Sequence, residues 1–206
     1  MKRLISCLAV LFVVTSCCLY GQDFKAGIIA GVVPSQVDGD DMSGFNKIGF
    51  TAGAYASKAL NGNWFLQSEI TYTMKGSRVT SSKNTDFSKR ELTTNYIDLG
   101  LYCGYYIMDN LYLKLGLIPS VLIYHKEQTP GGISVDESSV AGFRPFNLLA
   151  SVGIGYFFTK HFLVGLTYNY SVFSLRKGSV EIFDYDIKEA NAQFHNYLTL
   201  TLAYQF

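Results

Sequence analysis

Apolar and polar side chains alternate in several long segments of this 206-residue chain. The clearest case is W-F-L-Q-S-E-I-T-Y-T-M-K at residues 64–75. Trp64 and Ile70 lie on one face of this segment, and Gln67 and Glu69 lie on the other. A period of two is typical of a β-strand with two different faces. We predict eight such strands, the first two from a weaker alternation, at residues 24–33, 47–58, 64–75, 95–107, 111–124, 146–158, 162–173 and 194–206.

The length of these segments indicates the solvent around them. Each is about 10 to 14 residues long, whereas strands of soluble proteins most often have about 5–6 residues. A tilted strand crosses a bilayer in about 9–11 residues. No stretch after residue 22 has a sustained period of 3.6 or about 18 uninterrupted apolar residues, which a transmembrane helix would need. The lengths therefore favour strands that span a membrane.

The two faces of the strands show which side is wet. One face is almost purely Leu, Ile, Val, Phe and Tyr, while the other mixes charged residues with Gly, Ser and Thr. A soluble, lipocalin-like barrel would enclose its apolar face, but a lysine or arginine facing lipid at mid-bilayer costs about 2–4 kcal/mol. We therefore predict an all-β fold, an eight-stranded antiparallel up-and-down transmembrane β-barrel with a polar lumen. The predicted lumen charge network consists of Lys25, Glu69, Lys75, Asp98 and Lys114.

The composition agrees with an all-β membrane protein. Charged residues make up 16% of the chain, against about 25% in an ordinary soluble domain. Aromatic residues make up 15%, and nineteen glycines accompany only four prolines, a mixture that favours strands and tight turns. The formal net charge of +1 argues against a nucleic-acid partner, which would need a concentrated basic patch.

The first 21 residues differ from the rest and resemble a secretory signal peptide. Two basic residues precede an apolar run that is too short to span a membrane as a helix. Two processing routes remain open: cleavage after Gly21, or lipidation at Cys17 in a lipobox-like V-T-S-C. The predicted domains are a signal peptide at 1–21 and a barrel at 22–206. After cleavage at Gly21, Cys103 is the one cysteine left, so no intramolecular disulfide can form.

The connections between the predicted strands alternate in length. Short turns lie at 61–63, 108–110 and 159–161, and long polar loops lie at 34–46, 76–92, 126–145 and 176–192. Outer-membrane barrels have short periplasmic turns and long outer loops. We therefore expect both termini to lie in the periplasm of a Gram-negative bacterium.

Aromatic residues cluster near the ends of the predicted strands. Rings at these positions are typical of the two interfacial belts of a membrane barrel. The predicted aromatic girdle contains Trp64, Tyr72, Tyr105, Phe158, Phe162 and Tyr170.

The chain resembles the PorT-like family of outer-membrane β-barrels. The resemblance rests on Gly27 and Gly31, on the segments at 65–76, 95–102 and 113–120, and on the last three residues, Y-Q-F. It implies an exported barrel; the family has no common activity, although a few members take part in protein secretion. The terminal Phe206, with Tyr204, also resembles the signal by which the barrel-assembly machinery recognises such proteins for insertion.

Three functions remain open from the sequence. The first is a non-catalytic binding, structural or secretion-associated protein that acts through long outer loops, with lipopolysaccharide or a protein partner at 76–92 and 176–192. The second is a narrow pore or solute-uptake barrel. The third is a lipid-modifying enzyme, for which His125 near Ser120 is the candidate. We expect no catalytic residues, metal or cofactor, because the three histidines are scattered and no nucleophile, base and acid share a recognisable spacing.

Overall fold

The computed structural model describes residues 24–39, 44–78, 91–128, 134–135, 142–176 and 193–206. The predicted signal peptide, both of its processing sites and most of the predicted loops at 76–92 and 176–192 lie outside these residues. None of the described residues forms a helix long and apolar enough to cross a membrane.

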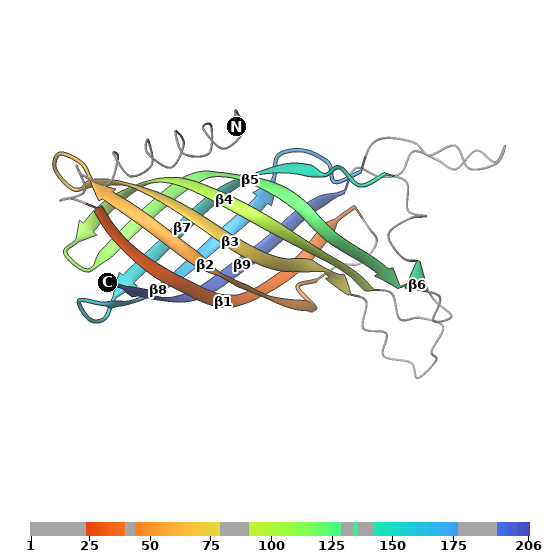
Figure 1. Ribbon diagram of the computed structural model, residues 1–206, viewed down its shortest axis with the longest axis horizontal. Helices are drawn as coiled ribbons and strands as arrows, with labels where there is room; N and C mark the ends of the chain where they lie inside the picture. Colours follow the sequence, from red (N-terminus) through yellow and green to blue (C-terminus); the bar gives the residue numbers. More distant parts are fainter. Residues whose placement is uncertain (1–23, 40–43, 79–90, 129–133, 136–141, 177–192) are drawn as a thin grey trace, which may run out of the picture.

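The described chain forms a closed antiparallel barrel (Figure 1). Neighbouring strands follow the order of the sequence, and β1 pairs with β9 to close the ring. The predicted eight-stranded all-β barrel is confirmed, with a two-residue strand, β6, added beside the end of β5. The strands are β1 (Phe24–Asp38), β2 (Lys47–Ala59), β3 (Trp64–Arg78), β4 (Glu91–Met108), β5 (Leu111–Gln128), β6 (Ser134–Val135), β7 (Phe146–Phe157), β8 (Phe162–Ser171) and β9 (Phe194–Gln205).

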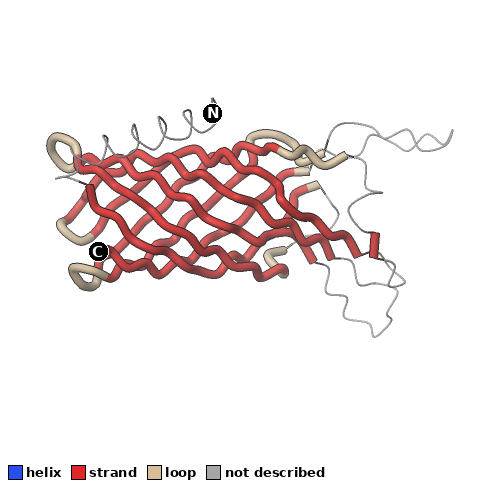
Figure 2. Tube along the Cα trace, viewed as in Figure 1, coloured by secondary structure: helices blue, strands red, loops and turns tan. Residues whose placement is uncertain are grey.

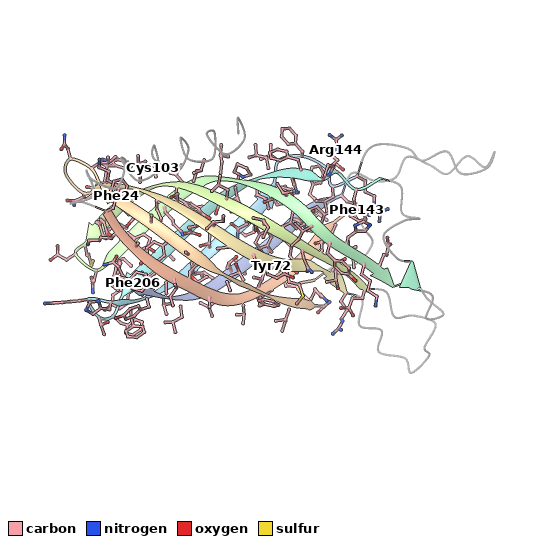
Figure 3. All side chains as sticks on the ribbon, viewed as in Figure 1. Phe24, Tyr72, Cys103, Phe143, Arg144 and Phe206 are labelled. Atoms are coloured by element: carbon pink, nitrogen blue, oxygen red, sulfur yellow. The ribbon has the colours of Figure 1, made fainter. Side chains whose placement is uncertain are left out.

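The alternation of the sequence becomes an alternation of burial. In β3, Phe65 is 3% exposed and Gln67 is 9% exposed, whereas Leu66 and Ile70, on the other face, are 49% and 58% exposed. Figure 3 shows side chains projecting from the outer wall around the barrel. The apolar face therefore points outward and the polar face points into the lumen.

The two ends of the barrel differ. The three short turns gather at one end, called here the short-turn end, together with the C-terminus (Figure 2). At the opposite end, called here the loop end, the strands run further than the sequence predicts. Arg78 pairs with Glu91, and Glu91 pairs with Gln128, so residues 76–78, 91–92 and 126–128 belong to strands and not to loops. The error arose because backbone pairing continues beyond the apolar positions from which the boundaries were predicted.

A β-bulge in β5 corrects one predicted face. Tyr96 pairs with Leu122, but Asn95 pairs with Tyr124, so Ile123 is the extra residue. An extra residue reverses the side on which the following side chains lie. The alternation of 111–124 puts Tyr112 and Tyr124 on the same, lumen-facing side, but Tyr124 is consequently exposed on the outer wall.

Both prolines within strands lie where pairing with one neighbour is interrupted. Near Pro34 the pairing of β1 with β9 skips, and near Pro119 the pairing of β5 with β4 skips. Proline cannot donate a backbone hydrogen bond, so it is tolerated where the ladder does not require one.

Candidate functional site

An aromatic layer fills the lumen near the short-turn end. The ring of Phe65 lies 4.9 Å from that of Tyr106 and 5.2 Å from that of Tyr112, the latter edge-on at 88°. Tyr112 also contacts Phe157 at 6.0 Å. Ring pairs of this kind contribute about 0.5–1.5 kcal/mol each beyond the area they bury. The layer occupies this end of the lumen with side chains from β3, β4, β5 and β7.

Two glycines in the barrel wall make room for these rings. A Cβ atom at Gly104 would lie 2.0 Å from Cζ of Phe65, and one at Gly155 would lie 2.1 Å from Cζ of Tyr112. Real Cβ atoms do not approach this closely, so the rings can lie this near to the wall only because these positions are glycine.

We expect Gly104→Val to destabilise the barrel by about 1–3 kcal/mol, because the new side chain displaces Phe65 from the aromatic layer. Urea unfolding in detergent micelles, followed by intrinsic fluorescence, measures the change. Ala150→Leu, which adds volume on the lipid-facing wall, serves as the matched control. Equal stability of the two variants would show that the contact with Phe65 does not matter.

Lys114 and Glu69 form an ion pair on the side of the aromatic layer that faces the loop end. Gln67 donates a hydrogen bond from Nε2 to Oε1 of Glu69 at 2.6 Å. The ammonium of Lys114 also lies 4.1 Å from the centre of the Tyr102 ring, a cation–π distance. Each charge of this pair therefore has at least two partners in the lumen.

Lys75 and Asp98 form a second ion pair closer to the loop end. Nζ of Lys75 lies 3.4 Å from Oδ2 of Asp98 and 3.3 Å from the hydroxyl of Tyr197. The rings of Tyr96 and Tyr197 lie 4.4 Å and 4.6 Å from the same ammonium. The side chain of Lys75 has no exposed surface, so its charge depends on these partners.

These two ion pairs together contain two acids and two lysines, so their charges balance. Lys25, predicted to join them, instead lies exposed at the short-turn end and takes no part in either lumen ion pair. It is the second residue of β1, where the lumen opens to solvent. A cavity of about 30 Å³ lies between the pairs, lined in part by Glu69 and Asp98, and it has room for one or two waters.

Towards the loop end, the lumen is filled by buried residues that the sequence analysis did not single out. His195 is fully buried, with Nε2 3.4 Å from the hydroxyl of Tyr96. In the alternation of 194–206 the odd-numbered residues face the lumen, and this was the signal in the sequence that could have placed His195 there. Nearer the loop end, an apolar cluster forms a lid of Val37, Leu92, Leu175 and Phe143.

Ion pairs brace the strands at the loop end. Glu91 binds both Lys47 and Arg78, whose Nη2 lies 2.8 Å from Oε2. Burial raises the pKa of the Glu91 carboxyl, but hydrogen bonds from Lys47 and Arg78 lower it, and the net pKa is below the ordinary value. Arg176 binds Glu127 at 2.9 Å and lies over the Phe143 ring at 4.5 Å. These contacts link the bases of the long loops.

The predicted girdle residues lie on the outer wall in two groups. Trp64 contacts Tyr105 at 5.0 Å near the short-turn end, where Phe162 also lies 5.9 Å from Phe158 and 5.1 Å from Tyr204. Towards the loop end, the ring pairs are Tyr72 with Phe50 at 5.6 Å and Tyr170 with Phe194 at 6.0 Å.

The C-terminus is held in the barrel wall. The backbone N–H of Phe206 donates to the carbonyl of Ala26 at 2.9 Å, and that of Gln205 donates to the carbonyl of His161 at 2.7 Å. The ring of Tyr204 lies 5.7 Å from that of His161 and 5.8 Å from that of Phe206. His161, in the last short turn, thus contacts the terminal segment.

His125 and Ser120, the residues considered for catalysis, each contact a neighbouring residue. The ring of His125 lies on Phe143 at 4.9 Å, and the hydroxyl of Ser120 donates to the carbonyl of Ile118 at 3.3 Å. Across the described strands and turns, no three His, Cys, Asp or Glu residues are grouped so that they could hold a metal ion.

Comparison with known proteins places the chain in a family. Ail of Yersinia pestis is 15% identical with a TM-score of 0.52, over 90% of this chain and 100% of that one, a likeness that shows the fold. Neisserial surface protein A is 14% identical with a TM-score of 0.49, over 89% of this chain and 97% of that one. No curated protein matches the chain. The family described as the outer membrane protein beta-barrel domain matches residues 21–176, most of the sequence, and the chain belongs to that family.

Proposed function

We propose that this protein is a non-catalytic outer-membrane barrel that binds a partner through its long loops and does not conduct. The observation that carries this proposal is the filled lumen. An aromatic layer, two ion pairs and an apolar lid occupy it in succession from the short-turn end to the loop end. An eight-stranded barrel has an interior just wide enough for such side chains. A narrow pore, the alternative function, would need all of these layers to move aside.

The loop end supports a binding role. Strand pairing continues to Arg78 and Gln128, and ion pairs fix the bases of the long loops there. A rigid base lowers the entropy that a loop loses when it binds. Since Arg78 is held by Glu91, the basic residues of 79–90 are those that would meet lipopolysaccharide phosphates. As part of the same proposal, the protein is a member of the PorT-like family and supports a secretion machine.

The proposed orientation has the loops outside the cell and both termini in the periplasm. In a Cys103→Ser background, we expect Ser82→Cys and Ser179→Cys to react with an impermeant thiol reagent on intact cells, and Asn110→Cys to remain unlabelled. Asn110 lies in a short turn at the opposite end, so it is the matched control. Labelling of Asn110→Cys alone would show that the barrel has the opposite orientation.

The same three cysteines test binding. A short thiol-reactive photo-crosslinker at residues 82 and 179 should give a discrete adduct with a protein or with lipopolysaccharide, and the same reagent at residue 110, applied to permeabilised cells, should not give that adduct. An identical adduct from all three positions, or none from the loops, would contradict a loop-borne binding site.

A further inference from the structure

Lys58 is an exception on the outer wall of the barrel. Among the described strands, the other outward-facing charged residues lie at the loop end: Asp38, Arg78, Glu91 and Lys126. Lys58 instead lies next to the last residue of β2, at the short-turn end, and its side chain is exposed on the lipid-facing side. Its ammonium lies 5.2 Å from the centre of the Phe24 ring. The outward faces of the described strands therefore supply no carboxylate near Lys58, and an anion at its ammonium would come from another molecule.

The outer wall beside Lys58 is hollow. Strand pairing places Phe24, Lys58, Leu66 and Cys103 in one row across β1 to β4. Figure 3 labels Phe24 and Cys103, the two ends of this row, near each other at the short-turn end. The next row towards the loop end contains small side chains at its centre and consists of Ala26, Ala56, Ser68 and Leu101.

Two hollows meet at Lys58. The first, of about 500 Å³, has an apolar wall that includes Phe24, Ala56, Leu66 and Leu101. The second, of about 720 Å³, lies on the other side of the lysine, towards the turn, and is lined by Lys58, Ala59, Leu60, Asn61 and Trp64. An apolar groove directed into the membrane therefore adjoins a more polar one at the interface, with a positive charge between them.

We propose that this groove binds one phospholipid, with its phosphate on Lys58 and an acyl chain in the hollow over Ala56 and Ser68. The long lysine side chain reaches the interface, where lipid phosphates lie, and Trp64 provides an aromatic ring at that level. This site rests on the proposed orientation, which puts the short-turn end in the inner, phospholipid leaflet. The ligand class is a lipid with one phosphate and chains narrow enough for the groove.

The charge distribution favours a lipid over a second copy of the chain. A second barrel packed on this wall would bury Lys58, and the one described side-chain carboxylate at this end, Asp109, lies in a short turn and not on the outward face of a strand. An unpaired buried charge is strongly unfavourable. A phospholipid supplies both the anion and the apolar chain.

Native mass spectrometry of the purified full chain tests the site. The protein is reconstituted with phosphatidylethanolamine, phosphatidylglycerol or lipid A and then released from detergent. We expect one retained phospholipid per barrel and an affinity about five-fold lower in Lys58→Gln, the effect of one lysine near a lipid surface. Lys160→Gln, in a short turn at the same end, should bind as the wild type does.

A second pair of variants tests the hollow without changing the charge. Ser68→Leu fills the groove and should release the lipid, whereas Ala150→Leu, on the lipid-facing wall of β7, should not. Heat-modifiable migration checks that each variant is folded, and Lys58→Gln keeps the test decisive if Ser68→Leu does not fold. Equal retention by Lys58→Gln and Lys160→Gln, a preference for lipid A, or a dimer without lipid would each overturn the proposal. Cysteine labelling separates this result from an error in orientation.

Discussion

Lys114→Met is expected to destabilise the folded barrel by about 3–5 kcal/mol, because it leaves Glu69 as a buried carboxylate without its cation. Gln67 remains as a hydrogen-bond donor to Glu69, but an amide does not neutralise the charge. Urea unfolding in detergent micelles at neutral pH gives the free energy of unfolding.

The double variant Glu69→Met/Lys114→Met is the control for this prediction. Replacing both charges with apolar side chains of similar volume should recover most of the lost stability. Lys25→Met, at the exposed end of β1, should have little effect. If Lys114→Met were as stable as Lys25→Met, the ion pair would not hold the lumen together.

Deletion of Phe206 is expected to reduce assembly in the outer membrane several-fold. The stability of the folded protein should change only slightly. The Phe206 ring is 71% exposed and contacts Tyr204 at 5.8 Å, so its packing contributes only about 0.5–1.5 kcal/mol. The larger loss would follow from the proposed role of the terminal aromatic residues as an insertion signal. The fraction of heat-modifiable protein in isolated outer membranes measures assembly.

Refolding from urea into detergent is the companion measurement, since it needs no assembly machinery. The deletion variant should refold nearly as well as the wild type there. Phe158→Ala, which removes another exposed ring at the same end, should leave assembly intact. Normal assembly of the deletion variant, or an equal defect in Phe158→Ala, would contradict the signal.

The sequence could predict the strands and their faces because one physical pattern determines both. Successive side chains of a strand point to opposite sides, so the alternation around Glu69 assigns each residue to lipid or lumen without knowledge of its neighbours. A carboxylate facing lipid is too costly to be tolerated, which fixes the choice of face. For this reason the inward position of Asp98 and the outward position of Trp64 follow from the sequence alone.

The partners inside the lumen could not be predicted in the same way. Which charges meet depends on the stagger between strands, and Lys114 binds Glu69 from β3 whereas Asp98 binds Lys75. The bulge at Ile123 adds one residue without any turn signal in the sequence. Phe143 and Leu175 lie outside the described strands, so no periodicity marks them as parts of the lid.

The central claim is that side chains close the lumen, and single-channel recording in a planar bilayer tests it most directly. Purified protein, shown to be folded by its heat-modifiable migration, is inserted beside an open porin as the positive control. We predict no steady unitary current from the wild type at moderate voltage. A stable conductance that changes in size or ion selectivity in Glu69→Met/Lys114→Met would show that ions pass the lumen charges, and would contradict the account.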